Sequence, residues 1–561
     1  MALLSEIKEH IKASGPCLTV LLIALVLTGG FIDCWSCVIG TAVSAVLLYL
    51  IIKNKTLKLR FSLTFCAVLI IALFYLLTSF YGVDGGESLI GFVRFLPVPL
   101  FAVLLMQNDA YAKSVRSLLP YIAAGLGLIS LPLMLIPSLG FSVDGRLGGF
   151  FQYPNTFAAL LMVGELLLLA KPQKRIPDIV CALLLFGLIV LTQSRAVFVL
   201  TVLFSFVLLL ISVSKKGRII LLVAVIVLAT AIVLLYPVLS KTEPFSRFLS
   251  LSVFESTFAG RLLYWRDALP LILKHPFGMG YLGYYFTEQS VQTGVYAVRF
   301  IHNDILQLIL DVGWIPALLF AAAVLRKLFS KELKAGERLV LIALLLHICF
   351  DFDLQYAAMW FILLIILDDQ KGKSVTLRLP APAITVAAAG LLTLYFAVAL
   401  GLGHFGAHEA SLSLYPLNTE EAVTVMTKTS DPDKMNLQAE EILRRNQFVQ
   451  TAYSAKARYA LSVGDVEGLM KYKKRVFAVA PFDYTEYEDY AVALIYCADL
   501  YRQSGDTQSA KACDDELLAL RKQLTALPER LSYFGRIIQD QPKTTFPDSI
   551  NDYIDAIGVG S

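Results

Sequence analysis

Long apolar runs recur along this chain up to residue 402, and they restrict what it can fold into more than any other feature. A helix of about 20 apolar residues crosses a bilayer core, because a helix satisfies its own backbone hydrogen bonds without water. This length rule predicts about thirteen membrane spans. The spans are expected near residues 15–33, 37–52, 61–82, 88–106, 117–138, 155–170, 177–193, 195–213, 218–237, 303–325, 337–352, 355–368 and 381–402. The fold class predicted is therefore an all-α polytopic membrane protein.

Composition supports this fold class and excludes one class of partner. Hydrophobic residues make up 57% of the chain and charged residues only 16%, which is far more apolar than a soluble domain. The net charge of +4 is small, and the basic residues are spread over the short connections between spans. Nucleic acid is therefore not expected as a partner. The first span follows Lys8 and Lys12 without a small-residue cleavage site, so it is expected to be retained.

The lysines and arginines of the short connections predict the orientation, since cytoplasmic loops carry the excess of positive charge. Alternate connections are acidic or nearly uncharged, as around Asp33, Asp84 and Glu87. We expect the N-terminus inside, and the long loop at 238–301 and everything after the last span outside. The basic connections lie at 53–60, 113–116, 171–175, 215–218, 326–338 and 371–378.

From residue 404 onward the pattern changes to that of a soluble helical domain. Charged and apolar residues alternate there at spacings of three and four. The predicted domains are thus a membrane domain, 1–403, and an extracytoplasmic helical domain, 404–561. The pair Gly464-Asp465 recurs as Gly505-Asp506, which resembles tetratricopeptide repeats, although the spacing exceeds their period of about 34 residues. A non-repetitive helical bundle is the alternative.

Two cysteine pairs leave alternatives open. Cys34 and Cys37 form a C-x-x-C at the turn between the first two spans, without the βαβ context of a redox motif. They are interpreted as structural, with an outer-face disulfide as the alternative. Cys497 and Cys513 flank Gly505 symmetrically, and an extracytoplasmic position would permit a disulfide between them.

Ionisable residues within predicted spans are functional candidates, because a charge there costs about 3 kcal/mol on insertion scales. Arg94 is the clearest, either as a ligand for substrate or with its side chain extended to the outer headgroups. Glu165, Asp311 and the group His347–Asp353 are the others. Two aspartates separated by one residue point to different sides of a helix. Asp351 and Asp353 could therefore bind the same metal ion only if the helix has ended before them. For these two aspartates the preferred interpretation is a structural role or a contact with a substrate hydroxyl.

Four further arginines lie on the predicted outer side, against the positive-inside bias: Arg146, Arg195, Arg261 and Arg266. A guanidinium binds phosphate with two parallel hydrogen bonds and stays charged. Several of them at the outer leaflet would suit a lipid-linked diphosphate. The nearby Gly278–Gly283 reads formally as G-x-G-x-x-G, but without a βαβ unit it predicts a tight turn after Pro276 rather than a dinucleotide site.

His302 begins the tenth predicted span, and Asn303 is a plausible cap for that helix. The positive end of the helix dipole disfavours imidazolium, so the ring would tend to stay neutral and serve as a general base. Asn303, Tyr264 and Trp265 are the candidates for contacts with a sugar.

These elements, in this order, resemble the O-antigen ligase and O-antigen polymerase family of bacterial envelope glycosyltransferases. The segments that carry the resemblance are Arg146–Phe150 with Pro154-Asn155, Ser194-Arg195, Gly260–Trp265, His275–Gly280, and His302-Asn303 followed by Gly313. The resemblance implies a membrane C-type glycosyltransferase in the cytoplasmic membrane of a bacterium, acting at the outer leaflet. It also implies that no nucleotide sugar, ATP, metal or other cofactor takes part.

The donor implied is a glycan on undecaprenyl diphosphate, and the acceptor a hydroxyl of a glycan, lipid or protein. By this resemblance His302 is the base, and Arg195 and Arg261 bind the diphosphate. Arg94, Arg146 and Arg266 rest on the charge argument above. Membrane lipid is a further expected partner, and the helical domain could recruit envelope-assembly proteins.

Two alternative functions remain open from the sequence. A transporter or flippase for lipid-linked glycans would be expected to show inverted repeats and a midplane site of broken helices, and the sequence indicates neither. An assembly scaffold would depend on residues 404–561 and tolerate changes at the histidine and arginines.

Overall fold

The computed structural model describes residues 2–29, 33–220, 222–223 and 256–559. The chain divides into two compact units. We call the first the membrane unit (Met1–Leu77, Leu89–Ser252 and His302–Phe405) and the second the C-terminal unit (Thr78–Ser88, Val253–Ile301 and Gly406–Ser561). The sequence predicts a division after residue 403. The structure divides the chain after Phe405 and also groups the large loop with the C-terminal region.

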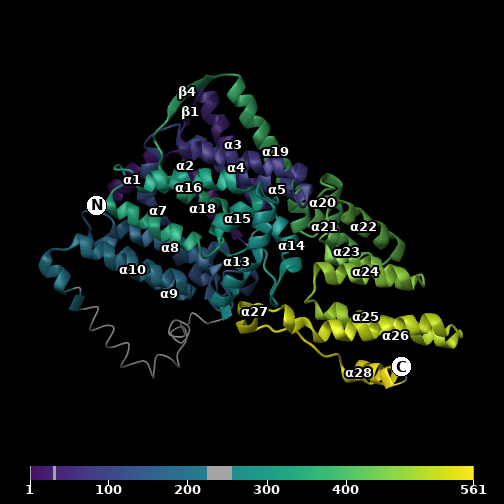
Figure 1. Cartoon of the computed structure of the whole chain (residues 1–561). Coiled ribbons are helices and arrows are strands. Elements are labelled where there is room, and N and C mark those ends of the chain that lie inside the picture. The colour runs from purple at the N-terminus through teal and green to yellow at the C-terminus, as the bar shows by residue number, and fades with distance from the viewer. Residues whose placement is uncertain (1, 30–32, 221, 224–255, 560–561) are drawn as a thin grey trace. The chain divides into compact units, whose positions relative to one another are not determined.

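Helices make up most of the membrane unit (Figure 1). Two short antiparallel ribbons pair β1 (Thr56–Phe61) with β4 (Lys373–Arg378) and β2 (Ser142–Val143) with β3 (Arg146–Leu147). The helices up to residue 212 are α1 Ala2–Ser14, α2 Pro16–Val26, α3 Asp33–Asn54, α4 Leu63–Tyr81, α5 Gly85–Phe95, α6 Pro97–Leu105, α7 Tyr111–Leu133, α8 Pro154–Leu169, α9 Ile176–Thr192 and α10 Arg195–Ser212. Those after residue 302 are α15 Asp304–Val312, α16 Trp314–Leu328, α17 Ala335–Ile348, α18 Ala357–Leu367 and α19 Ala381–His404.

Six helical stretches in the described part of the chain are long and apolar enough to cross a membrane. They are α3, α4, the pair α5 and α6, α7, α10 and α19. A seventh would be α1 with α2, which are bent by 91°. The protein is therefore an all-α, multi-pass membrane protein, and its helices lie near most of the predicted spans. The span predicted at 218–237 falls largely outside the described residues.

Several predicted spans are shorter or broken helices. The run expected at 303–325 is two helices, α15 and α16, which meet at Gly313 with a φ of +84°. α8, α9 and α18 are apolar but of 10–17 residues. Hydropathy reports how apolar a run is but not where its backbone bends, so the predicted number of spans stays a prediction.

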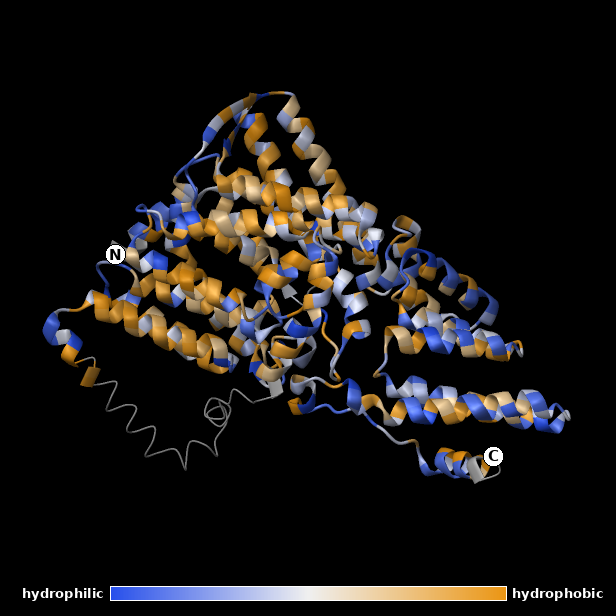
Figure 2. Ribbon diagram, viewed as in Figure 1, coloured by the Kyte–Doolittle hydropathy of each residue, from blue (hydrophilic) through white to orange (hydrophobic). Residues whose placement is uncertain are grey.

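The core of the membrane unit contains α18, in which all 11 residues are buried. A helix that is apolar on every side has no solvent-facing stripe and needs protein around it. α8 is nearly as enclosed. α3 and α19 instead pack along each other and leave side chains such as Tyr49 and Leu391 exposed. Both helices are coloured predominantly as hydrophobic in Figure 2, as contact with lipid requires.

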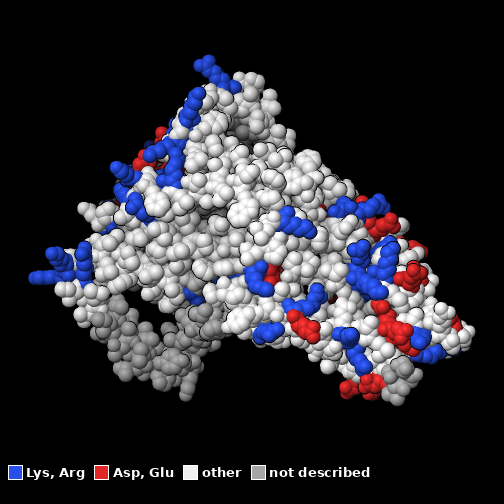
Figure 3. Space-filling view, in the orientation of Figure 1, with Lys and Arg blue, Asp and Glu red and all other residues white. Residues whose placement is uncertain are grey.

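Lys and Arg side chains gather at the end of the membrane unit where β1 and β4 lie (Figure 3). Lys58 and Arg60 of β1 pair with Asp109, at 3.3 and 2.7 Å. This pairing lowers the pKa of the Asp109 carboxyl, chiefly through its hydrogen bond from Arg60. The positive-inside rule predicts that this end faces the cytoplasm.

The helices of the C-terminal unit mix hydrophilic and hydrophobic residues, drawn blue and orange in Figure 2. Gly464 and Gly505, with φ of +76° and +82°, form equivalent turns between paired helices. Asp465 and Asp506 cap the helices that follow, accepting from the amides of Gly468 and Ser509. The helices are α13 Ser256–Lys274, α14 Gly283–Val291, α20 His408–Leu414, α21 Thr419–Lys428, α22 Pro432–Arg445, α23 Gln450–Ser462, α24 Val466–Val479, α25 Tyr484–Gln503, α26 Thr507–Thr525, α27 Tyr533–Ile537 and α28 Asp548–Val559.

The recurring Gly-Asp pairs thus mark a repeated helical turn, and their assignment to tetratricopeptide repeats stays a prediction. Gly278 and Gly280 have φ of +90° and +84°, so the tight turn predicted after Pro276 is confirmed. Cys497 and Cys513 are buried thiols in the core of α25 and α26, and Cys34 and Cys37 are buried thiols in α3.

Candidate functional site

His302 lies directly before α15 in a backbone conformation that few residues other than glycine adopt, with φ of +53°. Asn303 follows as the N-cap, and its Oδ1 accepts from the amides of Ile305 and Leu306 at 3.1 and 3.0 Å. The helix cap predicted at Asn303 is confirmed. Because a cap and a left-handed residue meet here, the imidazole is presented from a fixed piece of backbone.

The His302 ring is oriented by a buried carboxylate that is distant in sequence. Its Nδ1 lies 3.3 Å from Oδ1 of Asp351, whose side chain is 2% exposed against 21% for the histidine. The ring also packs on Phe352, with centroids 4.7 Å apart. A proton on Nδ1 facing the carboxylate leaves the imidazole lone pair on Nε2, which is the tautomer of a general base.

Asp351 is itself held in place by two donors. The hydroxyl of Tyr153 donates to its Oδ1 at 2.9 Å, and Nδ2 of Asn155 donates to its Oδ2 at 2.7 Å. Both donors come from the start of α8, in the segment Arg146–Asn155 that the sequence singles out. A carboxylate fixed by these donors can stabilise an imidazolium next to it.

Arg146 extends this network by one more step. Its Nη2 donates to Oδ1 of Asn155 at 2.8 Å, and its Nε donates to the carbonyl of Thr192 at 3.0 Å. A continuous set of hydrogen bonds thus runs from the end of α9 through Arg146, Asn155 and Asp351 to His302. The structure brings Arg146 and His302 into one polar cluster of the membrane unit.

Arg195 lies beside this cluster along the chain. It is the first residue of α10, and Ser194 is the N-cap residue. Thr192, whose carbonyl accepts from Arg146, is at the other end of the same turn. Arg195 is half-buried. Because it is the first residue of α10, its guanidinium belongs to the positive end of a helix, where anions are favoured.

A second histidine and aspartate lie buried next to the first pair. His347 and Asp353 are 2.5 Å apart and 1% and 0% exposed, and Thr156 donates to Asp353 at 2.7 Å. The two aspartates therefore pair with different histidines. Among the residues that the structure describes, no group of three or more His, Cys, Asp or Glu side chains could hold a metal ion.

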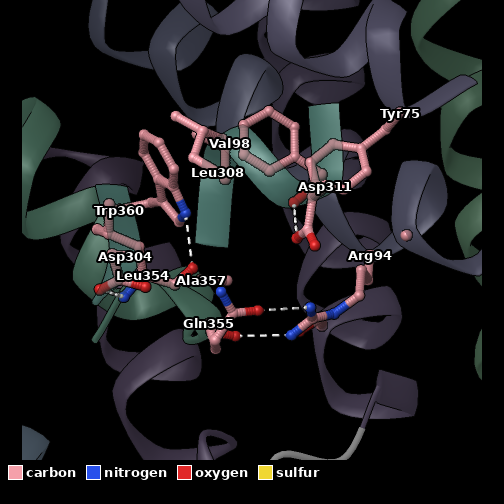
Figure 4. Close-up of a pocket in the computed structure, with 13 residues that line it drawn as sticks. Tyr75, Arg94, Val98, Asp304, Leu308, Asp311, Leu354, Gln355, Ala357 and Trp360 are labelled. Carbon is pink, nitrogen blue, oxygen red and sulfur yellow. Dashed lines mark hydrogen bonds between the residues drawn. The ribbon is translucent and has the colours of Figure 1, made fainter. Parts of the chain in front are cut away.

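Arg94 lines a small polar cavity of about 30 Å³ in the membrane unit (Figure 4). Its Nε lies 2.9 Å from Oδ1 of Asp33, and its terminal nitrogens donate to Oε1 and the carbonyl of Gln355 at 3.1 and 2.7 Å. A cavity of this size has room for water but not for a diphosphate. The contacts of Arg94 join α3 and α5 to the segment that follows Asp351.

The other intramembrane carboxylates also contact protein groups. On the wall of the same cavity, Asp311 accepts from Tyr75 and from Gln307, both at 2.8 Å. Glu165 accepts from Ser205 at 3.0 Å. Neither residue joins the His302 cluster through the contacts described here.

The remaining sequence candidates lie on α13 of the C-terminal unit. Nη1 of Arg266 contacts Thr293 Oγ1 at 2.6 Å and Asp267 Oδ1 at 3.3 Å. Trp265 Nε1 donates to the carbonyl of Ile301 at 3.1 Å. The ring of Tyr264 packs on that of Tyr296. Arg261 is half-buried on the same helix.

Sequence reasoning missed the pairing of Asp351 with His302. It noted both residues but separated them, because Asp351 lies close to His347 in the sequence and 49 residues from His302. One signal was available. A carboxylate at the end of an apolar helix requires a partner, and His302 is among the histidines predicted at that side of the membrane.

Comparison with known proteins adds one finding. No curated protein matches the chain. Residues 180–321 match the family model described as O-antigen ligase. The matched stretch contains Arg195, Arg261 and His302 but neither Arg94 nor Arg146. Over these residues the chain is similar to the O-antigen ligase family, and the resemblance predicted from its motifs is confirmed there.

Proposed function

We propose that this protein is a glycosyltransferase that works at the outer leaflet of the cytoplasmic membrane. It transfers or polymerises a glycan from an undecaprenyl-diphosphate-linked donor onto an acceptor hydroxyl, in the synthesis of an envelope polysaccharide. The observation that carries the proposal is the pairing of His302 with Asp351. His302 stands at a capped helix start inside the stretch that matches the O-antigen ligase family, and Asp351 comes from beyond that stretch.

The proposed reaction is a displacement at the anomeric carbon of the donor sugar. Nε2 of His302 takes the proton of the acceptor hydroxyl, and the hydroxyl oxygen forms the new glycosidic bond. The bond from the anomeric carbon to the diphosphate oxygen breaks, and undecaprenyl diphosphate leaves with its electron pair. Asp351 stabilises the imidazolium that forms, as the acid does in other His–Asp pairs.

The negative charge that grows on the diphosphate requires fixed positive charge. Arg195 and Arg261 are proposed for this role, because both fall in the matched domain and a guanidinium binds phosphate oxygens in pairs. Arg266 and Arg146 are secondary candidates. For Arg94 the contacts with Asp33 and Gln355 favour a positioning role.

Glycan transfer by the purified protein tests the proposal. The protein in nanodiscs would receive a lipid-diphosphate-linked glycan and an acceptor glycan, and the product would be identified by mass spectrometry. His302→Ala is expected to lower kcat by about 10²- to 10⁴-fold, the usual contribution of a general base. Tyr533→Ala, an exposed change in the C-terminal unit, is the matched control and should leave kcat unchanged.

Full turnover by His302→Ala would contradict the assignment of the base. Movement of intact donor across liposome membranes without a new glycosidic bond would favour the transporter alternative.

A further inference from the structure

A groove of about 470 Å³ lies within the C-terminal unit, where the transfer chemistry described above places no residue. Residues of α14 and the segment 297–299 form one wall, and residues of α21 and of the start of α23 form the other. Its volume falls in the range of binding pockets for small ligands. The chemistry of its walls indicates what it holds.

One wall contains a buried carboxyl group with unused hydrogen-bonding capacity. Glu288 is 2% exposed, and its Oε1 accepts from the amide of Val298 at 3.4 Å. Within the described structure no donor reaches its Oε2. The side-chain amide of Gln292 donates to the carbonyl of Tyr296 and also interacts with the Glu288 carboxyl, but no donor in the described part of the chain lies within hydrogen-bond distance of Oε2. A buried polar atom without a partner is costly, so a ligand that supplies a hydrogen bond here is favoured.

The groove carries little net charge. Burial raises the pKa of Glu288 to about 8, which keeps it largely protonated at neutral pH. Arg299 and Glu420 form a two-bond ion pair at 2.6 and 2.7 Å, so their charges cancel. An anionic ligand would meet no surplus positive charge, and a cationic ligand no surplus negative charge.

Two partly exposed aromatic rings belong to the lining. Tyr285 and Phe448 are 37% and 36% exposed and come from α14 and from the residues before α23. The guanidinium of Arg299 lies 5.3 Å from the Tyr285 ring centre and fixes that ring from one side. Aromatic faces beside amide and carboxyl groups suit the apolar faces and hydroxyl edges of sugar rings.

We propose that this groove binds an uncharged segment of a glycan, a few sugars long. Glu288 exchanges hydrogen bonds with a sugar hydroxyl, and Tyr285 and Phe448 stack on sugar rings. The binding itself needs no transfer chemistry. Its use, holding the acceptor glycan at a second place along its length, rests on the proposed function.

Titration calorimetry of the full-length protein in nanodiscs tests the binding. The probe is the set of short oligosaccharides released by mild acid from the lipid-linked glycan of cells that make this protein. Saturable binding is expected, with Kd raised at least tenfold by Phe448→Ala and by Glu288→Ala. Glu288→Gln keeps a donor and an acceptor and should lose less affinity than Glu288→Ala. Tyr496→Ala, exposed on α25 and outside the groove, should bind as wild type does.

An absence of saturable binding by the wild-type protein would overturn the proposal. So would a wild-type Kd in both Phe448→Ala and Glu288→Ala. Thermal unfolding of each variant distinguishes a loss of affinity from a loss of folding. Phe448 is partly exposed, and Glu288→Gln replaces the buried carboxyl with a group of the same shape.

Transfer kinetics separate this inference from the proposed function. Phe448→Ala should raise KM for long acceptors while kcat and the KM for short acceptors stay the same. His302→Ala should lose transfer yet keep the oligosaccharide affinity. Transfer retained by His302→Ala would contradict the proposed chemistry alone. An acceptor KM that does not depend on acceptor length in the wild type or in Phe448→Ala would contradict the groove alone.

Discussion

At the scale of single residues, His302 shows how a side chain is fixed for one task. Its backbone has a φ of +53°, Asn303 caps the helix beyond it, and the ring lies between Asp351 and Phe352. Holding a histidine in this conformation costs about 1–3 kcal/mol. The surrounding contacts of α8 and α15 must supply that energy.

Arg94 is expected to act through structure rather than by binding the donor. Arg94→Ala removes one partner of a largely buried ion pair with Asp33 and should destabilise the protein by about 3–5 kcal/mol. Arg94→Lys keeps the charge and should recover part of this loss. Thermal unfolding and the donor KM of both variants measure the effect. A raised donor KM with unchanged unfolding temperature would instead support a diphosphate contact.

Glu288 makes the stability of the C-terminal unit depend on pH. Burial raises the pKa of the Glu288 carboxyl in the folded state from the ordinary 4.5 to about 8. Between these two pH values the folded state holds a proton that the unfolded state has lost. Its contribution is fully present below pH 4.5 and is lost as pH rises through 8. Glu288→Gln should raise the unfolding temperature more at pH 9 than at pH 6. An equal change at both pH values would contradict this.

At the scale of elements, the start of α15 links the helix to the chemistry. Asn303 Oδ1 accepts two backbone amides, and loss of such a cap costs about 1 kcal/mol. Asn303→Ala should therefore lower both stability and kcat, because the backbone that carries His302 loosens. Asn303→Asp keeps the accepting oxygen and should retain both.

Unfolding temperature and kcat of the two Asn303 variants also address the sugar contact predicted at this residue. Loss of activity in both, with stability lost only in the alanine variant, would favour that contact over the cap.

Gly313 separates α15 from α16 at a φ of +84° and a ψ of −179°, a conformation open almost only to glycine. Gly313→Ala should lower the unfolding temperature, at a cost of about 1–3 kcal/mol. Gly187→Ala is the matched control, because nothing lies within 4 Å of an added Cβ there and the change is within a regular helix. Equal unfolding temperatures for the two variants would mean that the break tolerates a side chain.

The elements differ in how far the sequence reveals them. α3, α4, α7 and α19 lie close to their predicted ranges, because length and hydropathy are local properties. The break at Gly313 depends on the packing around it and was not predicted, whereas α18 lies within the short span predicted at 355–368. The pairing of His302 with Asp351 depends on α8, α15 and the turn before α18 meeting, so hydropathy and motif spacing could not supply it.

At the scale of the whole molecule, the basic connections predict which end of the membrane unit faces the cytoplasm. The predicted orientation puts Tyr533 outside and Lys216 inside, and both lie on exposed surface. Tyr533→Cys should react with a membrane-impermeant maleimide in intact cells, whereas Lys216→Cys should react only after lysis. The opposite pattern would reverse the orientation. The native cysteines, none of them exposed, set the background.

The most direct measurement of the central claim is a double-mutant cycle on kcat in the purified transfer assay. Asp351→Asn keeps the shape of the side chain but removes its charge, so it should lower kcat by about 10-fold or more through its effect on His302. In a His302→Ala background the same change should have almost no further effect, because a positioning residue acts through the residue it holds. Losses that multiply in the double variant would contradict the account, since the two residues would then act independently.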